Sequence, residues 1–231
     1  MAPGDSQVLA RRTWMDVAAS PDHILIMAVG SCEQHGPHLP LGTDTLIAES
    51  LCERACDLRN DLVMGPTISL GSSGEHQDFP GTLSIGTEAL AALLTEVVRS
   101  ARRSFQGVVF VSGHGGNASA LATTEKLARH EGDALCCFSP SIEGGDAHAG
   151  RSETSLLLWL WPEGVGEFEG ITGQVAPLSE IMESLREHGV KSVSDNGVLG
   201  DPRGASRKEG EALFATLTSQ LLTTIEKRFD Q

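Results

Sequence analysis

The architecture follows most directly from one stretch, Val108-Val109-Phe110-Val111-Ser112-Gly113-His114-Gly115-Gly116-Asn117. Its first four residues are apolar and mostly β-branched, which is typical of a short strand buried on both faces of a sheet. The residues that follow are small and surround His114, so that backbone and ligand can approach closely there. A second apolar run, Ile24–Val29, ends in the same way at Gly30. Both runs predict buried strands with polar groups at their carboxyl ends.

Helical periodicity occupies the sequence between and after these strands. Apolar residues recur at helical spacing over 43–58, 87–105, 118–130, 152–160 and from Ser206 through Ile225. The last segment opens with the capping box Ser206-Arg207-Lys208-Glu209. Further strand candidates lie at 62–64 and 134–138. Strands that alternate with helices predict an α/β fold with a largely parallel sheet covered on both faces. No repeat or linker interrupts residues 1–231, so we expect a single domain.

Composition argues against several classes of function. The chain of 231 residues carries 17 Lys and Arg against 31 Asp and Glu, which gives a net charge of −14. An acidic chain repels phosphate backbones and anionic lipids, so we expect no nucleic-acid partner and no membrane partner. Aromatic residues make up only 4% and Tyr is absent, which removes platforms for base stacking. The 40% of apolar residues is sufficient for a substantial core.

The sequence also predicts where the protein resides. No apolar run approaches the roughly 18 residues that a membrane span needs. Residues 1–16 are polar and charged and lack the apolar stretch of a signal peptide, so we expect a cytoplasmic protein. The five cysteines are odd in number and contain no C-x-x-C pair, which indicates neither a disulfide framework nor a zinc ribbon.

The richest polar cluster follows the first predicted strand and runs from Gly30 to Asp44. Glu33 and His35 are two residues apart, so in an extended segment both side chains point to the same side. Asp44 falls near the start of the next helix, where the helix dipole stabilises a carboxylate that could also bridge two cations. A polar loop with a helix cap would explain any one of these residues, but it explains the whole cluster less well.

Three further clusters combine histidine with carboxylates or glycines, at 74–81, 113–117 and 146–155. A phosphate-binding glycine loop is a rival interpretation of 113–117, but the segment lacks both G-x-x-x-x-G-K-[ST] and G-x-G-x-x-G. For Glu153, which begins a predicted helix, compensation of the helix dipole is an alternative to a role in a site.

Together the clusters offer the carboxylates of Glu33, Asp44 and Glu153 and the imidazoles of His35, His114 and His148. Three carboxylates carry too much negative charge to be buried without cations, and this donor set suits Zn, Fe or Mn. Two divalent metal ions bridged by one carboxylate and one hydroxide would nearly neutralise the set. Such a site polarises a carbonyl and generates hydroxide near neutral pH, which predicts a metal-dependent hydrolase.

Four ordered motifs resemble those of the creatininase family, also called creatinine amidohydrolases. They are Gly30 through Asp44, Gly74-Glu75-His76 through Phe79-Pro80-Gly81-Thr82, Gly113 through Asn117, and His148-Ala149-Gly150 through Glu153-Thr154-Ser155. The resemblance spans nearly the whole chain. It implies a three-layer α/β/α sandwich with a mostly parallel central sheet, a two-metal centre, hydrolysis of carbon–nitrogen bonds in amides by metal-hydroxide attack on the carbonyl, and a homo-oligomer.

The same resemblance implies roles for individual residues. Asp44 would bridge the two metals, Glu33 and His114 would complete one site, and His35 would serve the other. His148 resembles the family histidine that assists proton transfer, although it could instead be a histidine at a helix entry that orients its neighbours. The residues expected to contact substrate are Glu75, His76, Gly115 and Asn117.

One departure from creatininase itself bears on the second metal. Creatininase carries a glutamate two residues after the histidine that matches His114, whereas this chain has Gly116. The second metal then needs another carboxylate. We expect Glu153 to provide it, with Glu75 as the next candidate.

Within the family, the chain resembles most the branch that processes the mycofactocin precursor. The similar segments are 81–90, 189–194, 196–202 and 206–214. That branch removes a C-terminal Val-Tyr dipeptide from a modified precursor peptide in redox-cofactor biosynthesis. Residues 139–145 contain no Trp to match the mobile lid over creatinine, which counts against creatinine as substrate. Two alternatives remain: an amidohydrolase acting on a small cyclic amide or formamide, and a metal-stabilised binding or assembly subunit without catalysis.

Overall fold

Four parallel strands form the central sheet in the computed structural model, which describes residues 7–230. The strands are β1 (Ile24–Val29), β2 (Leu62–Met64), β3 (Gly107–Ser112) and β4 (Leu135–Phe138). Their order across the sheet is β2-β1-β3-β4, so the two longest strands are neighbours at its centre. Ile24 pairs with Leu62 on one side and with Gly107 on the other. All ladders are parallel, which sharpens the sequence prediction of a mostly parallel sheet.

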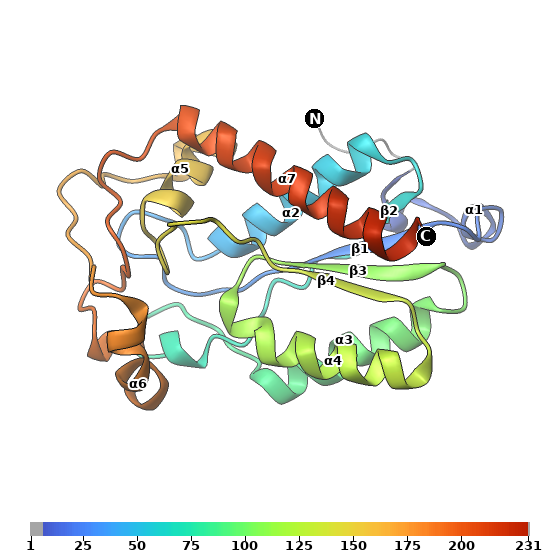
Figure 1. Cartoon of the computed structure of the whole chain (residues 1–231), viewed down its shortest axis with the longest axis horizontal. Helices are drawn as coiled ribbons and strands as arrows, with labels where there is room; N and C mark the ends of the chain where they lie inside the picture. Colours follow the sequence, from blue (N-terminus) through green and yellow to red (C-terminus); the bar gives the residue numbers. More distant parts are fainter. Residues whose placement is uncertain (1–6, 231) are drawn as a thin grey trace.

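Helices cover both faces of this sheet (Figure 1). On one face lie α2 (Thr43–Leu58), α5 (Arg151–Leu160) and α7 (Arg207–Phe229). On the other lie α3 (Thr87–Ala101) and α4 (Ala118–Glu131). The predicted three-layer α/β/α sandwich is therefore confirmed.

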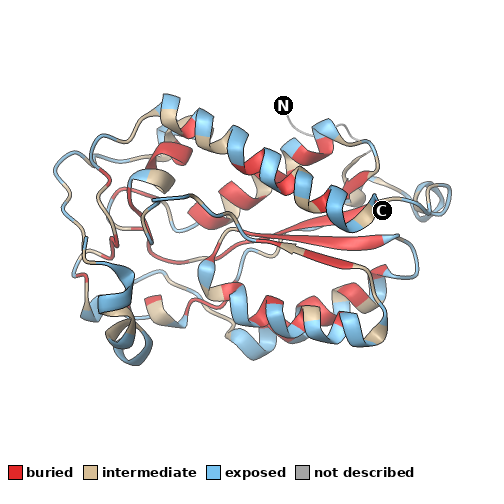
Figure 2. Ribbon diagram, in the orientation of Figure 1, coloured by how far each residue is buried: buried red, intermediate tan, exposed pale blue. Residues whose placement is uncertain are grey.

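Strand β1 shows why the sheet needs two helical layers. All six of its residues are buried, and they alternate between two separate apolar clusters. Ile24 and Ile26 pack with the α2, α5 and α7 side, whereas Leu25 and Met27 pack with the α3 and α4 side. Figure 2 shows the same division, with buried residues along the strands and on the helix faces turned toward them. A strand that is apolar at every position can exist only between two such layers.

Two helix predictions need correction. Helix α3 ends at Ala101, not at Phe105, because the chain turns there and the amide of Phe105 donates back to the carbonyl of Ala101. Phe105 is apolar for another reason, since it packs on the edge of the α3–α4 cluster. The capping box of α7 is only half formed. Ser206 accepts from the amide of Glu209, but its own amide donates to the hydroxyl of a neighbouring serine instead of to the Glu209 carboxylate.

Several short elements were not predicted. They are the helices α1 (Trp14–Ala18) and α6 (Leu178–His188) and the 3-10 turns η2 (Leu9–Arg11), η3 (Gly74–His76), η4 (Gly115–Asn117), η5 (Pro162–Gly164) and η6 (Val190–Ser192). Helix α6 has no buried residue and lies beside η3 and η6. It stands apart from the sheet, at the end of the molecule toward which β1 and β3 run (Figure 1).

The structure of residues 7–230 also bears on the predictions about cysteines and membrane spans. All five cysteines are free thiols, and three of them are buried in the core. None of the helices within residues 7–230 combines the length and the apolar composition that crossing a bilayer requires.

Candidate metal centre

The strand ends bring the predicted clusters together. Glu33 and His35 lie on the loop that leaves β1, and His114 lies two residues beyond the end of β3. Asp44 is in the first turn of α2, and Glu153 is in the first turn of α5. Because β1 and β3 are adjacent and parallel, their carboxyl ends open at the same edge of the sheet. Glu33, His35, Asp44 and His114 are all buried.

Asp44 stands between the two halves of the site. Its Oδ1 lies 3.1 Å from Nε2 of His35, and its Oδ2 lies 3.4 Å from Nδ1 of His114. The hydroxyl of Ser31 donates to Oδ2 at 2.6 Å, which fixes the carboxylate in this orientation. Each oxygen of one carboxylate therefore faces a different imidazole. This is the geometry that a bridging ligand between two ions requires.

Backbone carbonyls set the ring orientation of both imidazoles. Nδ1 of His35 lies 3.2 Å from the carbonyl oxygen of Glu33, and Nε2 of His114 lies 3.0 Å from that of Ser72. A carbonyl only accepts, so each of these nitrogens carries the hydrogen. The opposite nitrogens, Nε2 of His35 and Nδ1 of His114, then turn toward carboxylates. Metal-bound histidines are commonly held in this way by a carbonyl behind the ring.

Glu33 lacks the partners that a buried carboxylate needs. Neither of its oxygens has a hydrogen bond of good geometry among the described residues, although the side chain is fully buried and imidazole nitrogens approach Oε1. Its Oε1 lies 3.1 Å from Nδ1 of His114, 3.3 Å from Nε2 of His76 and 3.8 Å from Nδ1 of His148. A buried carboxylate without hydrogen bonds is costly unless a cation compensates it. The donor set therefore fits a divalent ion beside Glu33.

A second group of donors surrounds His35. Oε2 of Glu153 lies 4.0 Å from Nε2 of His35 and accepts the amide hydrogen of Ala149 at 2.6 Å. Ala149 is held in the left-handed region with φ of 53°, which folds the chain back so that its amide reaches the helix's first turn. Three sets of ligand atoms lie close enough together to share an ion: Glu33, His35 and Asp44; His35, His148 and Glu153; and Glu33, His76 and His148.

The charges in the site shift the pKa of every member. Burial alone would lower the pKa of His35, but the carboxylates of Asp44, Glu153 and Glu33 together outweigh burial and raise it to about 10. His114 responds in the same way to Glu33, and its pKa rises to about 9. Burial raises the pKa of Asp44, but the charges of His35 and His114, together with the hydrogen bonds from His35 and Ser31, outweigh burial and lower it. The protons on His35 and His114 occupy the nitrogens that a metal ion would use.

The remaining members are pushed toward their neutral forms. Burial, followed by repulsion from Asp44, raises the pKa of Glu33. Burial likewise raises that of Glu153 to about 7. For His76 and His148 burial acts in the opposite sense, since it penalises the imidazolium. The pKa of His76 falls to about 3 and that of His148 falls well below its usual range. Both are uncharged near neutral pH.

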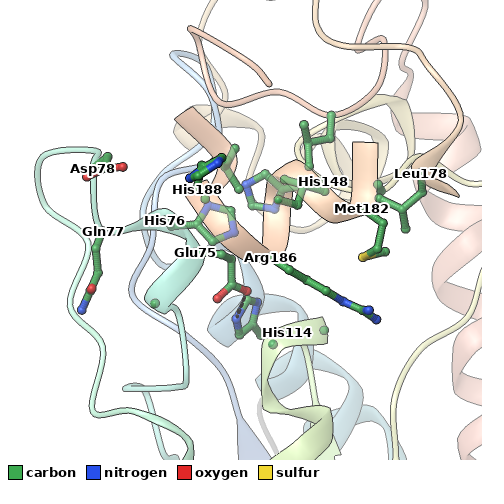
Figure 3. Close-up of a pocket in the computed structure, with 18 of the residues that line it drawn as sticks. Glu75, His76, Gln77, Asp78, His114, His148, Leu178, Met182, Arg186 and His188 are labelled. Atoms are coloured by element: carbon green, nitrogen blue, oxygen red, sulfur yellow. Dashed lines mark ion pairs between the residues drawn. The ribbon is translucent and has the colours of Figure 1, made fainter. Parts of the chain in front are cut away.

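An open pocket of about 970 Å³ gives access to these groups. Asp44, His114, His148 and Glu153 contribute to its wall. Figure 3 shows Gln77 and Asp78 on one side, Leu178, Met182 and Arg186 of α6 on the other, and Glu75, His76 and His114 between them. The pocket is within the range of volumes that small-molecule and peptide-end sites occupy.

Of the four residues predicted to contact substrate, three line the pocket and one does not. Glu75, His76 and Gly115 line the pocket. Asn117 is buried away from the pocket wall. Its Oδ1 accepts from the amide of Ser72 at 2.9 Å, and its Nδ2 donates to the carbonyl of Gly30 at 3.0 Å. Asn117 thus ties together the loops that carry the site.

Comparison with known proteins now identifies the chain's relatives. The model of the creatininase family, described as creatinine amidohydrolase, matches residues 10–225. The chain belongs to the creatininase family. The mycofactocin precursor peptide peptidase of Mycolicibacterium smegmatis is 44% identical over 209 residues, which cover 88% of this chain and 85% of that protein. The one of Mycobacterium tuberculosis is 45% identical over 217 residues, covering 90% and 86%.

A solved structure extends the comparison to the fold. The crystal structure of a creatinine amidohydrolase (creatininase) matches with a TM-score of 0.76 at 22% sequence identity, and covers 99% of this chain and 100% of that one. The α/β architecture of the creatininase family is thereby confirmed for this chain. The sequence resemblance to the branch that processes the mycofactocin precursor is confirmed by the relatives at 44–45% identity.

Gly116 occupies the position at which the resemblance to creatininase predicts a glutamate. A Cβ atom there would lie 2.3 Å from Nε2 of His114, 2.4 Å from the carbonyl oxygen of Ser72 and 2.6 Å from Oε1 of Glu75. The space beside Gly116 is therefore filled, in part by the Glu75 carboxylate. Glu75 lies 3.5 Å from Nε2 of His114, the nitrogen that faces away from Asp44. This places Glu75 behind the His114 ring.

Sequence reasoning missed two residues that contact the site. Ser31 donates to Asp44, and Gln34 contacts both His76 and His148. Both stand in the cluster that follows β1: Ser31 precedes Glu33, and Gln34 lies between Glu33 and His35. The available signal was their position: in an extended segment Gln34 points away from Glu33 and His35, toward whatever packs behind them.

Proposed function

We propose that this protein is a metal-dependent peptidase that removes a C-terminal Val-Tyr dipeptide from the modified mycofactocin precursor peptide. The observation that carries the proposal is a buried Asp44 whose two oxygens face His35 and His114, in a chain 44–45% identical to mycofactocin precursor peptide peptidases. The pocket beside it is open enough for the end of a peptide to enter.

In this proposal the residues divide into two ligand sets. Glu33 and His114 would hold one ion, His35 and Glu153 would hold the other, and Asp44 would belong to both. Solved creatininases described as Zn-Zn type and as creatininase Mn support two divalent ions, and Zn, Fe and Mn all suit this donor set. When bound, two such ions would polarise the amide carbonyl and supply hydroxide near neutral pH.

The protein's own groups orient the reaction. His148 is buried and neutral, and it stands beside the Glu33 carboxylate, where it can accept a proton and return it to the departing amine. Leu178, Met182 and Leu185 of α6 line the pocket and offer apolar contacts to the peptide's side chains. Glu75 and His76 line the same pocket and would offer polar contacts to the substrate backbone.

The test combines substrate and metal. Purified protein is incubated with the modified precursor peptide, and the products are identified by mass spectrometry. We expect loss of the Val-Tyr mass, abolition of cleavage by a chelator, and recovery on adding Zn, Fe or Mn. Full activity in metal-free protein contradicts the mechanism. Turnover of a small cyclic amide or formamide without peptide cleavage would identify the alternative function.

Glu153 is tested separately, because the second site depends on it. Glu153→Gln keeps the size and removes the charge, so it should lower occupancy of the His35 site and leave the Glu33–His114 site filled. Glu163→Gln is the matched control, since Glu163 is exposed just beyond α5. Unchanged metal content and rate in Glu153→Gln would refute the assignment.

The family resemblance also leads us to propose a homo-oligomer, which sedimentation velocity measures directly. A monomer at all concentrations would contradict it.

A further inference from the structure

The side-chain amide of Gln34 is held in one orientation. Gln34 is buried between Glu33 and His35, and its Oε1 accepts the amide hydrogen of Gly36 at 2.9 Å. Its Nε2 donates to the carbonyl oxygen of Gly197 at 3.1 Å. The first contact requires an acceptor and the second a donor, so the oxygen and nitrogen of the amide cannot be exchanged.

The second hydrogen of this amide has two imidazoles within reach. Gln34 Nε2 lies 2.8 Å from Nδ1 of His76 and 3.0 Å from Nε2 of His148. Nε2 of His148 also lies 2.8 Å from the backbone carbonyl oxygen of Gln34, which only accepts. That nitrogen therefore carries a hydrogen and cannot accept another. The amide hydrogen goes to His76, whose Nδ1 must be unprotonated.

The two histidines consequently present opposite groups to Glu33. With Nδ1 unprotonated, the His76 proton is on Nε2, which is 3.3 Å from Oε1 of Glu33. With its proton on Nε2, neutral His148 has its lone pair on Nδ1, which is 3.8 Å from the same oxygen. The rings are also packed together, with centroids 4.5 Å apart between His76 and His148. Both tautomers follow from contacts with one residue.

We propose that Gln34 is a positioning residue whose side chain makes His76 a proton donor and whose backbone carbonyl makes His148 a proton acceptor beside Glu33. His76 then has no free lone pair on Nε2 and orients the Glu33 carboxylate instead of binding an ion. His148 keeps the lone pair that the reaction needs. The role in the reaction rests on the proposed function, whereas the tautomers do not depend on the substrate.

The test is the tautomeric state of two rings. In zinc-loaded protein labelled with 15N-histidine, long-range 1H–15N spectra distinguish the protonated ring nitrogen, and His76→Gln and His148→Gln assign the signals. We expect both rings in the Nε2–H form. Gln34→Glu has the same shape but no donor, so His76 should move to a form protonated at Nδ1, whereas His148, held by the backbone, should not change.

Two further variants complete the design. Gln174→Glu is the matched control, because Gln174 is a half-buried amide that, like Gln34, has two backbone partners but lies outside the site. Gln34→Met removes both donors without adding charge and serves if Gln34→Glu does not fold; its His76 should lose the single Nε2–H form. Loss of an orienting partner should lower zinc affinity and kcat/KM by about 10- to 100-fold.

Three results would overturn the inference: His76 protonated at Nδ1 in the unmodified protein, His148 protonated at Nδ1 only, or His76 unaffected in both Gln34 variants. Failure of the proposed function looks different. In that case the unmodified protein shows the expected tautomers and cleaves no precursor peptide.

Discussion

Binding of metal ions at the centre should release protons. The number of protons released depends on the groups whose pKa is shifted. His35 and His114 have pKa values of about 10 and about 9, so each carries nearly one proton at pH 7 on the nitrogen that an ion would take. Glu153, with a pKa of about 7, carries about half a proton. Binding of two zinc ions at pH 7 should therefore release at least about 2.5 protons per chain.

The same protons make the affinity for metal ions depend on pH, and this affinity should increase with pH. Protons compete with metal for these atoms, so affinity rises as pH rises until it passes the pKa of each group. Near pH 7 the overall constant for two ions should rise by about 2.5 powers of ten per pH unit. At pH 8 Glu153 is largely ionised, and the release should fall to about 2 protons.

Titration calorimetry in buffers of different ionisation enthalpy measures the released protons directly. At zinc concentrations that fill both sites, Glu153→Gln removes one titrating group, so it should lower the release at pH 7 by about half a proton and change little at pH 8. A release below about one proton at pH 7, or an affinity independent of pH, would show that His35 and His114 do not hold the metals.

Three substitutions test other parts of the structure. Asp44→Ala removes the shared ligand, so metal analysis should show both ions bound more than about 100-fold more weakly and turnover nearly abolished; normal metal content would show that the bridge is misassigned. In Gly116→Ala the new methyl would lie 2.3 Å from an imidazole nitrogen, so urea unfolding should show that the free energy of unfolding falls by about 1–3 kcal/mol. The control Gly115→Ala has nothing within 4 Å of the new methyl, and its free energy of unfolding should change by no more than about 0.5 kcal/mol. Equal stabilities of the two variants would contradict this packing. Ser206→Ala removes the acceptor for the amide of Glu209 and should cost about 1 kcal/mol by the same measurement, and no change would show that the cap is not needed.

The layered fold could be predicted because the apolar pattern of a strand indicates whether one or both faces of the sheet are covered. Ile24–Val29 is apolar at every position, and only a strand between two helical layers tolerates that pattern. The end of α3 was harder to predict, because Phe105 continues the apolar spacing of the helix although the chain has already turned at Ala101. Helix α6 was missed although Leu178, Ile181, Met182 and Leu185 stand at helical spacing. It buries none of its residues, because this apolar face lines the pocket and not the core.

The candidate site could be predicted in its residue types but not in its orientation. Spacing places Glu33 and His35 on one side of a loop, but it cannot tell which imidazole nitrogen meets a carboxylate. Those choices depend on carbonyl groups brought in from other loops, such as that of Ser72 behind His114. The role of Gln34 likewise depends on Gly197, which is far away in sequence and adjacent only in the fold.

Helix α2 also acts as a spacer between the metal centre and the two ends of the described chain. Asp44 is in its first turn, whereas Arg59 directly follows its last residue. Arg59 contacts both ends of the described chain: its carbonyl accepts a hydrogen bond from Gln7, and its guanidinium donates to Asp230. At 1.5 Å per residue, the helix separates these points by about 22 Å. Gln7 and Asp230, where the described chain begins and ends, are thus anchored far from Asp44. Immobilising the protein through carriers attached beyond these residues should leave the pocket open to long peptides.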